Sequence, residues 1–111
     1  MGKKRISESE GLAALADQAT QLPTAVRYLL QQIETSHPGH SLEMRVPPYG
    51  AIQCLEGLEH RRGTPPNVVE IEPEEFVNLC LGKLSFDEAK TLRASGARAI
   101  EAEGLFPLSG Y

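Results

Sequence analysis

Residues 42–56 read L-E-M-R-V-P-P-Y-G-A-I-Q-C-L-E, and this stretch sets the fold class because the hydrophobic period changes here. Apolar residues alternate with charged ones from Leu42 to Val46, as in a strand with one buried face. The next four residues place proline at the second turn position and glycine at the fourth, which suits a type I turn. A second strand is predicted over 51–56, and its inward face is ambiguous because both alternating sets contain apolar residues. The stretch therefore predicts a β-hairpin.

Two helices are predicted before this hairpin. Ser7 and Glu10 have the spacing of a capping box, in which the two side chains satisfy free N–H groups at a helix start. Pro23 is tolerated in the first turn of the second helix, which is predicted to end near Thr35. The apolar positions at helical spacing are Leu12, Leu15, Ala16 and Ala19 in the first helix and Val26, Leu29, Leu30 and Ile33 in the second.

A third strand, two short helices and a last strand are predicted after the hairpin. The third strand covers 67–71, and Pro73, followed by acidic residues, opens a helix. Ser85 and Glu88 form a second capping box, which predicts a short fourth helix. Residues 97–101 are predicted to form a strand of small residues.

Helices and strands thus fall in blocks along the chain and do not alternate. This order predicts an α+β fold in which helices pack on one face of a mostly antiparallel sheet of about four to five strands. A length of 111 residues fits one domain. We predict a flexible N-terminal segment over 1–10, since chain ends fray unless they are tied down, and a single domain over 11–111.

Composition excludes several classes of function. A net charge of −4 disfavours nucleic-acid binding, because such domains usually present a basic face. No apolar run reaches the roughly 18 residues that a membrane helix needs, so no membrane insertion is expected. The first residues lack the apolar stretch of a secretory signal, which predicts a cytoplasmic protein. In a reducing compartment, Cys54 and Cys80 are expected to be buried free thiols.

Several stretches together resemble the sterol carrier protein superfamily, over roughly residues 24–108. Two of them are similar to its compact bacterial branch, which is found in actinobacteria. Those two are R-V-P-P-Y-G-A-I-Q-C at 45–54 and R-G-T-P-P-N-V-V-E at 62–70. The others are E-P-E-E-F-V-N-L-C-L-G-K-L-S-F-D-E-A at 72–89, R-A-S-G-A-R-A at 93–99 and L-F-P-L at 105–108.

The resemblance implies a sheet covered by helices, with an apolar tunnel between the layers in the lipid-binding members. Those members bind fatty acyl chains, acyl-CoA or sterols, and they have no catalytic residues of their own. Larger members close the tunnel with an additional C-terminal helix, which is expected to be missing or vestigial here. A deep sterol-sized cavity is therefore not expected.

Apolar residues on the predicted inward faces either line a ligand pocket or fill a core, and both roles need the same chemistry. The candidates are Val26, Leu29, Leu30, Ile33, Phe76, Leu79, Phe86, Leu105 and Phe106. Arginine forks suit carboxylate or phosphate groups, and loops on rigid scaffolds often carry function. Arg45, Arg61, Arg62 and Asn67 are accordingly the candidates for contact with an acidic ligand headgroup, while a solvated loop is the alternative role of the arginine pair.

No catalytic residue, cofactor or metal site is predicted. His37 and His40 form only a pair, whereas zinc needs three or four ligands. The chain has neither a G-x-S-x-G elbow nor a glycine-rich phosphate loop.

The leading hypothesis is a small non-catalytic protein that binds a lipid or fatty-acyl ligand between helices and sheet. The alternative is an interaction module without a cavity, which forms a homodimer or binds a larger enzyme. A third hypothesis is a small enzyme in which His60 and the arginines act on an acidic substrate.

Overall fold

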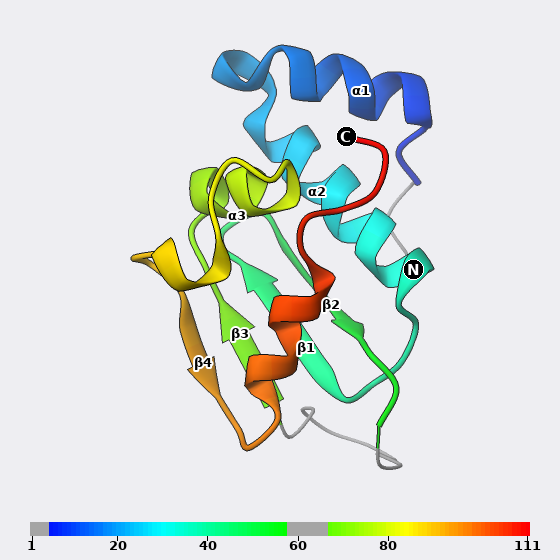
Figure 1. The fold of residues 1–111 in the computed structure, drawn as a ribbon. Coiled ribbons are helices and arrows are strands. Elements are labelled where there is room, and N and C mark those ends of the chain that lie inside the picture. Colours follow the sequence, from blue (N-terminus) through cyan, green and yellow to red (C-terminus); the bar gives the residue numbers. More distant parts are fainter. Residues whose placement is uncertain (1–4, 58–66) are drawn as a thin grey trace.

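A computed structural model describes residues 5–57 and 67–111. Figure 1 shows the helices gathered around one end and one side of a small sheet. In chain order the elements are α1 (Glu8–Ala16), α2 (Gln18–Ser36), β1 (Leu42–Val46), β2 (Gly50–Cys54), β3 (Asn67–Glu70), α3 (Pro73–Cys80), the 3-10 helix η1 (Phe86–Glu88), β4 (Arg93–Ser95) and the 3-10 helix η2 (Ala99–Leu105).

The four strands form one sheet in the order β2-β1-β3-β4. β1 is antiparallel to β2 and parallel to β3, whereas β4 is antiparallel to β3. Cys54 and Asn67 both lie opposite Leu42, so β2 ends and β3 begins on either side of the start of β1. The predicted α+β class is confirmed, and the central pair is parallel because β3 starts from the same end of the sheet as β1.

The predicted hairpin is confirmed by its antiparallel register, in which Leu42 lies opposite Cys54 and Val46 opposite Gly50. Its turn differs from the prediction. The Tyr49 N–H donates to the Val46 carbonyl at 2.9 Å, and the Pro47–Pro48 peptide is cis. A cis proline at the third turn position defines a type VI turn, so the predicted type I turn is wrong.

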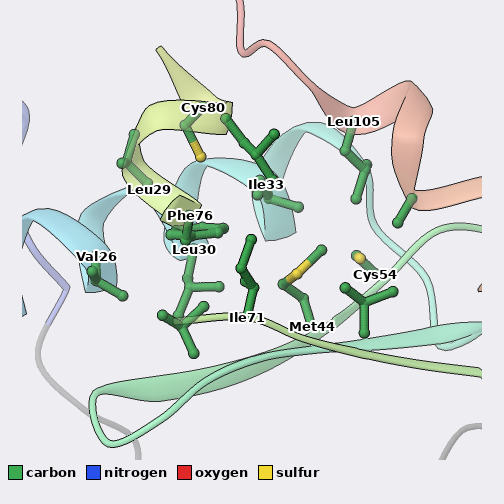
Figure 2. Packing of buried hydrophobic residues seen from close by; sticks show 14 of the residues in the cluster. Val26, Leu29, Leu30, Ile33, Met44, Cys54, Ile71, Phe76, Cys80 and Leu105 are labelled. Atoms are coloured by element: carbon green, nitrogen blue, oxygen red, sulfur yellow. The ribbon is translucent and has the colours of Figure 1, made fainter. Parts of the chain in front are cut away.

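Helices cover one face of the sheet, and the core fills the space between the layers (Figure 2). On β1, the buried side chains are those of Leu42, Met44 and Val46, as the alternation predicts. On β2, Cys54 is buried and Ala51 is exposed, so the even-numbered set faces the helices. The opposite face of the sheet carries Glu43, Arg45, Gln53, Val68 and Glu70.

The first capping box is confirmed. The Glu10 N–H donates to the Ser7 hydroxyl, and the Ser7 N–H donates to the Glu10 carboxylate, each at 3.2 Å. α2 ends at Ser36, close to the predicted end, and Gln21 interrupts its helical geometry just before Pro23. The proline therefore stands near the start of a new helical segment, where its missing N–H is not needed.

Tyr28 fastens two distant segments to α2. A Cβ atom on Gly11 would lie 2.3 Å from the Tyr28 ring, so only glycine allows α1 to approach this closely. The Tyr111 ring meets the same tyrosine edge-on at 6.2 Å, and the Tyr111 hydroxyl donates to the Tyr28 hydroxyl at 3.0 Å. Desolvation, followed by this hydrogen bond, raises the pKa of Tyr111 to about 12, so the hydroxyl stays protonated at physiological pH.

The C-terminal part departs most from the prediction. The second capping box, at Ser85 and Glu88, is confirmed, but it opens a single 3-10 turn rather than a fourth α-helix. The strand predicted over 97–101 is wrong, because these residues form a turn and the start of η2, and the fourth strand is β4. Ala99, Ala102 and Leu105 are the buried residues of η2, and their spacing of three matches the period of a 3-10 helix.

Hydrogen bonds to Glu75 hold the chain just after η1, so η1 does not continue into a longer helix. Its carboxylate accepts hydrogen bonds from the Lys90 N–H at 2.9 Å, the Thr91 N–H at 2.8 Å and the Thr91 hydroxyl at 2.6 Å. The same hydroxyl accepts from the Glu72 N–H at 3.1 Å, which caps the start of α3. One side chain of α3 thus ties the entry of β4 to the helix.

We expect Glu75→Gln to lower the free energy of unfolding at pH 7 by about 1 kcal/mol, since an amide lacks the charge and one acceptor. The hydrogen bond from the Thr91 hydroxyl, followed by those from the backbone, lowers the pKa of Glu75 in the folded protein. A lowered folded pKa means that this stabilisation is complete above the unfolded value of roughly 4.3 and disappears as the pH falls through the folded value. Urea unfolding at pH 7 and at acidic pH measures the difference.

Glu74→Gln is the matched control, because Glu74 lies in the same helical turn and is exposed. It should change stability little at either pH. An equal effect of the two substitutions, or an effect of Glu75→Gln that persists at acidic pH, would contradict a stabilising role of the hydrogen bonds to the Glu75 carboxylate.

Candidate functional site

Most of the apolar candidates form a filled core. Seven of the nine are at most 2 % exposed and contact one another between the layers, as Figure 2 shows for most of them. These seven are Val26, Leu29, Leu30, Ile33, Phe76, Leu79 and Leu105. Their burial supports the sequence alternative of close packing at these positions.

The other two candidates, Phe86 and Phe106, are only partly buried. Their rings stack with centroids 6.4 Å apart and planes 26° apart. Phe106 also meets the buried ring of Phe76 edge-on at 6.2 Å. The pair therefore extends the core to the surface and leaves aromatic area facing solvent.

These two rings belong to a hollow of about 380 Å³, which we call the Phe86–Phe106 groove. Its apolar walls come from the turn after α3, from η1 and from the segment after η2. The lining residues are Gly82, Lys83, Leu84, Ser85, Phe86, Glu88, Glu103, Phe106 and Pro107.

A Schellman motif at the end of α3 places the first wall of the groove. The Lys83 N–H donates to the Asn78 carbonyl at 2.8 Å, and the Gly82 N–H donates to the Leu79 carbonyl at 3.2 Å. Gly82 has φ +78°, the left-handed conformation that this motif requires and that glycine adopts without penalty. The glycine in the sequence G-K-L thus turns the chain toward the groove.

The segment after η2 forms the opposite wall. Leu105 anchors it in the core, and the Leu108 N–H donates to the Cys80 carbonyl at 2.9 Å. Pro107 packs beside the turn, since a Cβ atom on Gly82 would lie 3.4 Å from its ring. The two walls are therefore held together by backbone contacts and not only by side chains.

Charges of both signs stand at the rim. Lys83 is the cation among the lining residues, and Glu88 and Glu103 are the acids. The Glu88 carboxylate accepts from the Ser85 N–H at 2.9 Å, and this bond, with that from the Ser85 hydroxyl, lowers the pKa of Glu88. Glu88 is therefore ionised at neutral pH, and its carboxylate is already hydrogen-bonded to Ser85. An apolar floor under a charged rim can hold an amphipathic molecule.

The structure does not bring the headgroup candidates together in one described site. Arg61 and Arg62 lie outside the described residues, as does His60. Arg45 lies on the open face of the sheet, where its guanidinium is 3.2 Å from the Glu43 carboxylate. The role predicted for the arginine pair stays a prediction.

Asn67 is buried and holds the chain together. Its amide nitrogen donates to the Ser41 carbonyl at 2.9 Å, and its amide oxygen accepts from the Arg98 N–H at 2.9 Å. Both ends of the side chain are therefore used inside the protein. Lys83, in contrast, is a rim cation that sequence reasoning missed, and its position before the aromatic Phe86 was the only local signal.

The cysteines are free and buried, as predicted. Burial, followed by the charge of nearby Glu34, raises the pKa of Cys54 to about 12. Burial also raises the pKa of Cys80. Neither thiol is ionised at neutral pH, and only a thiolate is a good nucleophile.

The described residues contain no cluster of three or more histidines, cysteines or acids that could hold a metal ion. His40 instead pairs through Nδ1 with the Gln53 amide oxygen at 2.7 Å. Within the same part of the chain, no helix is long and apolar enough to cross a membrane.

Comparison with known proteins places the chain in a family. A family model described as "Bacterial SCP ortholog", where SCP stands for sterol carrier protein, matches residues 18–108. No curated protein matches the chain. The matched segment begins with α2 and contains every residue of the Phe86–Phe106 groove, while α1 precedes it. The chain therefore belongs to the bacterial sterol carrier protein family.

Proposed function

We propose that the protein is a small carrier for a ligand with an alkyl or acyl chain, and that the chain lies in the Phe86–Phe106 groove. The observation that carries this proposal is the stacked, partly exposed pair of phenylalanines in the wall of the groove. Covering apolar surface is favourable by roughly 25 cal/mol per Å², so a bound alkyl chain stabilises this arrangement. Membership of a carrier family supports the same conclusion.

The size of the groove favours a slender ligand. Its volume of about 380 Å³ lies at the lower end of the range of roughly 300–1,000 Å³ that is common for small-molecule sites. The apolar helical faces behind it are already packed against the sheet. We therefore propose an alkyl chain that lies along the surface rather than a sterol enclosed in a tunnel.

Phe86→Ser is expected to weaken binding of a fluorescent fatty acid about tenfold or more, since a covered aromatic side chain contributes roughly 1.5–3 kcal/mol. The control is Ile100→Ser, because Ile100 is 60 % exposed and lies outside the groove. Fluorescence titration measures both variants, and thermal unfolding verifies that each is folded. Equal affinities of the two folded variants would move the ligand away from this groove.

The headgroup is tested in the same titration with a fatty acid and the fatty alcohol of equal length. Lys83→Met should weaken binding of the acid and leave the alcohol unchanged, because only the carboxylate gains from an ammonium group. Arg61→Ala combined with Arg62→Ala tests the sequence-based candidates with the same pair of ligands. Loss of acid binding in the arginine variant alone would assign the headgroup to that pair.

Native mass spectrometry of protein purified from cells gives an independent test of the ligand class. We expect a bound species with an acyl chain, present in wild type and depleted in Phe86→Ser. Repeated preparations without bound lipid, together with no affinity for fatty acids, would contradict the carrier function.

A further inference from the structure

Among the described residues, β2 is an edge strand whose outer side pairs with no other segment. Within residues 5–57 and 67–111 it pairs only with β1, and no other backbone hydrogen bond is formed by residues 50–53. Edge strands normally carry charges, prolines or bulges, or are very short, because bare edges recruit other strands. β4, at the other edge, has three residues and begins with Arg93. β2 reads G-A-I-Q-C and has none of these protections.

A basic group stands at one end of this edge. Arg27 is exposed, and a Cβ atom on Gly50 would lie 3.9 Å from the Arg27 Cγ atom. The arginine stem thus lies over the first residue of β2. Its guanidinium has no ion pair with any residue that the structure describes.

An acidic hollow stands at the other end. It has a volume of about 450 Å³ and contains two glutamates but no lysine or arginine among its lining residues. Glu43 is already paired with Arg45, whereas Glu34 is exposed and has no ion pair within the described ranges. The lining residues are Glu34, Pro38, Gly39, His40, Glu43, Ala51, Ile52 and Gln53.

The distance between the basic group and the acidic hollow matches the length of β2, so the edge can pair with a second copy of itself. Arg27 and Glu34 are seven residues apart on α2, which is about 10.5 Å along a helix. Gly50 and Gln53 are three residues apart on β2, which is about 10 Å along a strand. A two-fold axis through the middle of β2 therefore brings the arginine of one copy to the acidic hollow of the other, and it does so twice.

We propose that two copies of this chain form a symmetric dimer through antiparallel pairing of their β2 strands, with Arg27 of each copy in the Glu34 hollow of its partner. The pairing joins the two four-stranded sheets into one and keeps all helices on the same face. A second copy is favoured over another partner because both the basic and the acidic half of the contact are on this one surface. None of the lining residues of the Phe86–Phe106 groove belongs to α2 or β2, so this proposal does not rest on the carrier function.

Charge reversal tests the pairing in the full chain. Exposed ion pairs are individually weak, but each single reversal turns two attractive contacts of the dimer into two repulsive ones. Arg27→Glu alone and Glu34→Arg alone should each weaken dimerisation about tenfold or more in sedimentation equilibrium. An equimolar mixture of the two variants should dimerise again, because their charges are then complementary, and so should the double variant.

Two further variants locate the interface on β2. Ala51→Lys places a charge on an exposed edge position and should weaken the dimer with both ionic partners intact. Arg93→Glu, at the opposite edge of the sheet, should leave it unchanged. Thermal unfolding verifies that all variants are folded.

Three results would overturn the proposal. One is a wild-type chain that sediments as a monomer at millimolar concentration. Another is a dimer that survives both single charge reversals, which places its interface elsewhere. The third is a mixture of the two single variants that stays monomeric, because Arg27 and Glu34 then do not meet. A wild-type monomer that instead binds a basic extended peptide would assign the edge to a different partner.

Discussion

Replacing Gly39 by alanine is expected to lower the free energy of unfolding by about 2–4 kcal/mol, since strain at a special backbone conformation is one of the few causes of large effects. Gly39 has φ +152°, and a Cβ atom there would lie only 1.9 Å from the Leu55 carbonyl oxygen. The obstacle is backbone rather than a flexible side chain. Relief therefore requires one of two chain segments to move.

Neither segment is free to move. The Leu55 N–H donates to the His37 carbonyl at 2.8 Å, and the Leu55 carbonyl accepts from the Ser41 N–H at 3.1 Å. Leu55 itself has φ +67°, which is rare for a residue with a side chain. The corner between α2 and β1 is thus locked to the end of β2, next to the acidic hollow.

Gly104→Ala is the matched control. A Cβ atom on Gly104 would have open space around it, and Gly104 does not have a positive φ. Its substitution should change stability by no more than about 0.5 kcal/mol. Urea unfolding of both variants gives the comparison, and similar midpoints would show that the Gly39 corner adapts at low cost.

Asn67→Ala is the second large effect, with an expected loss of about 2–4 kcal/mol. The substitution removes the donor to the Ser41 carbonyl and the acceptor for the Arg98 N–H. Asn67 is only 4 % exposed, so water does not readily replace it, and each unsatisfied buried group costs roughly 1–3 kcal/mol. The two hydrogen bonds of the Asn67 side chain join the starts of β1, β3 and η2.

Asn67→Asp tests the two hydrogen bonds separately, because it removes the donor and keeps the acceptor. A carboxylate still accepts from the Arg98 N–H, but it cannot donate to the Ser41 carbonyl and faces it with like partial charge. The variant should therefore be clearly destabilised despite its nearly identical shape. Asn78→Ala is the control, because Asn78 lies on α3 and alanine is a good helix former. Stability of Asn67→Asp close to wild type would show that one of the two hydrogen bonds is dispensable.

Local patterns were read correctly where the physics is local. Both capping boxes depend on two side chains three residues apart, so Ser7 with Glu10 and Ser85 with Glu88 could be recognised from spacing alone. The hairpin at β1 and β2 followed from alternation and turn residues. Its turn type did not follow, because the isomer of the Pro47–Pro48 peptide is not written in the local sequence.

The C-terminal part was read poorly because weak local preferences were overruled by distant contacts. Glu75 binds the chain at Lys90 and Thr91, and β3 then offers a partner for β4. The signal for η2 in the sequence is the spacing of three between the apolar residues Ala99, Ala102 and Leu105. A run of small residues also fits a strand, so this signal is ambiguous. Short elements of this kind depend on tertiary contacts more than on propensity.

The candidate site shows the same division. All nine apolar candidates take part in the core or pack against it, yet only Phe86 and Phe106 also line the groove. Sequence could not distinguish these two from the others, since burial depends on what the rest of the chain places on top of a residue. The rim position of Lys83 was missed for the same reason.

By itself, the sequence determined the class of this protein: an α+β domain with two capping boxes, a hairpin, buried free thiols and the stretches that mark the bacterial sterol carrier family. These features depend on residues that are close together in the chain, so the sequence itself shows the chemistry that produces them. Only the tertiary structure decided that most apolar candidates fill a core, that two aromatic rings reach the surface, and that no described segment pairs with the outer edge of β2 between Arg27 and Glu34. Each of these depends on which distant segments approach one another, and the free energy of such contacts belongs to the whole fold.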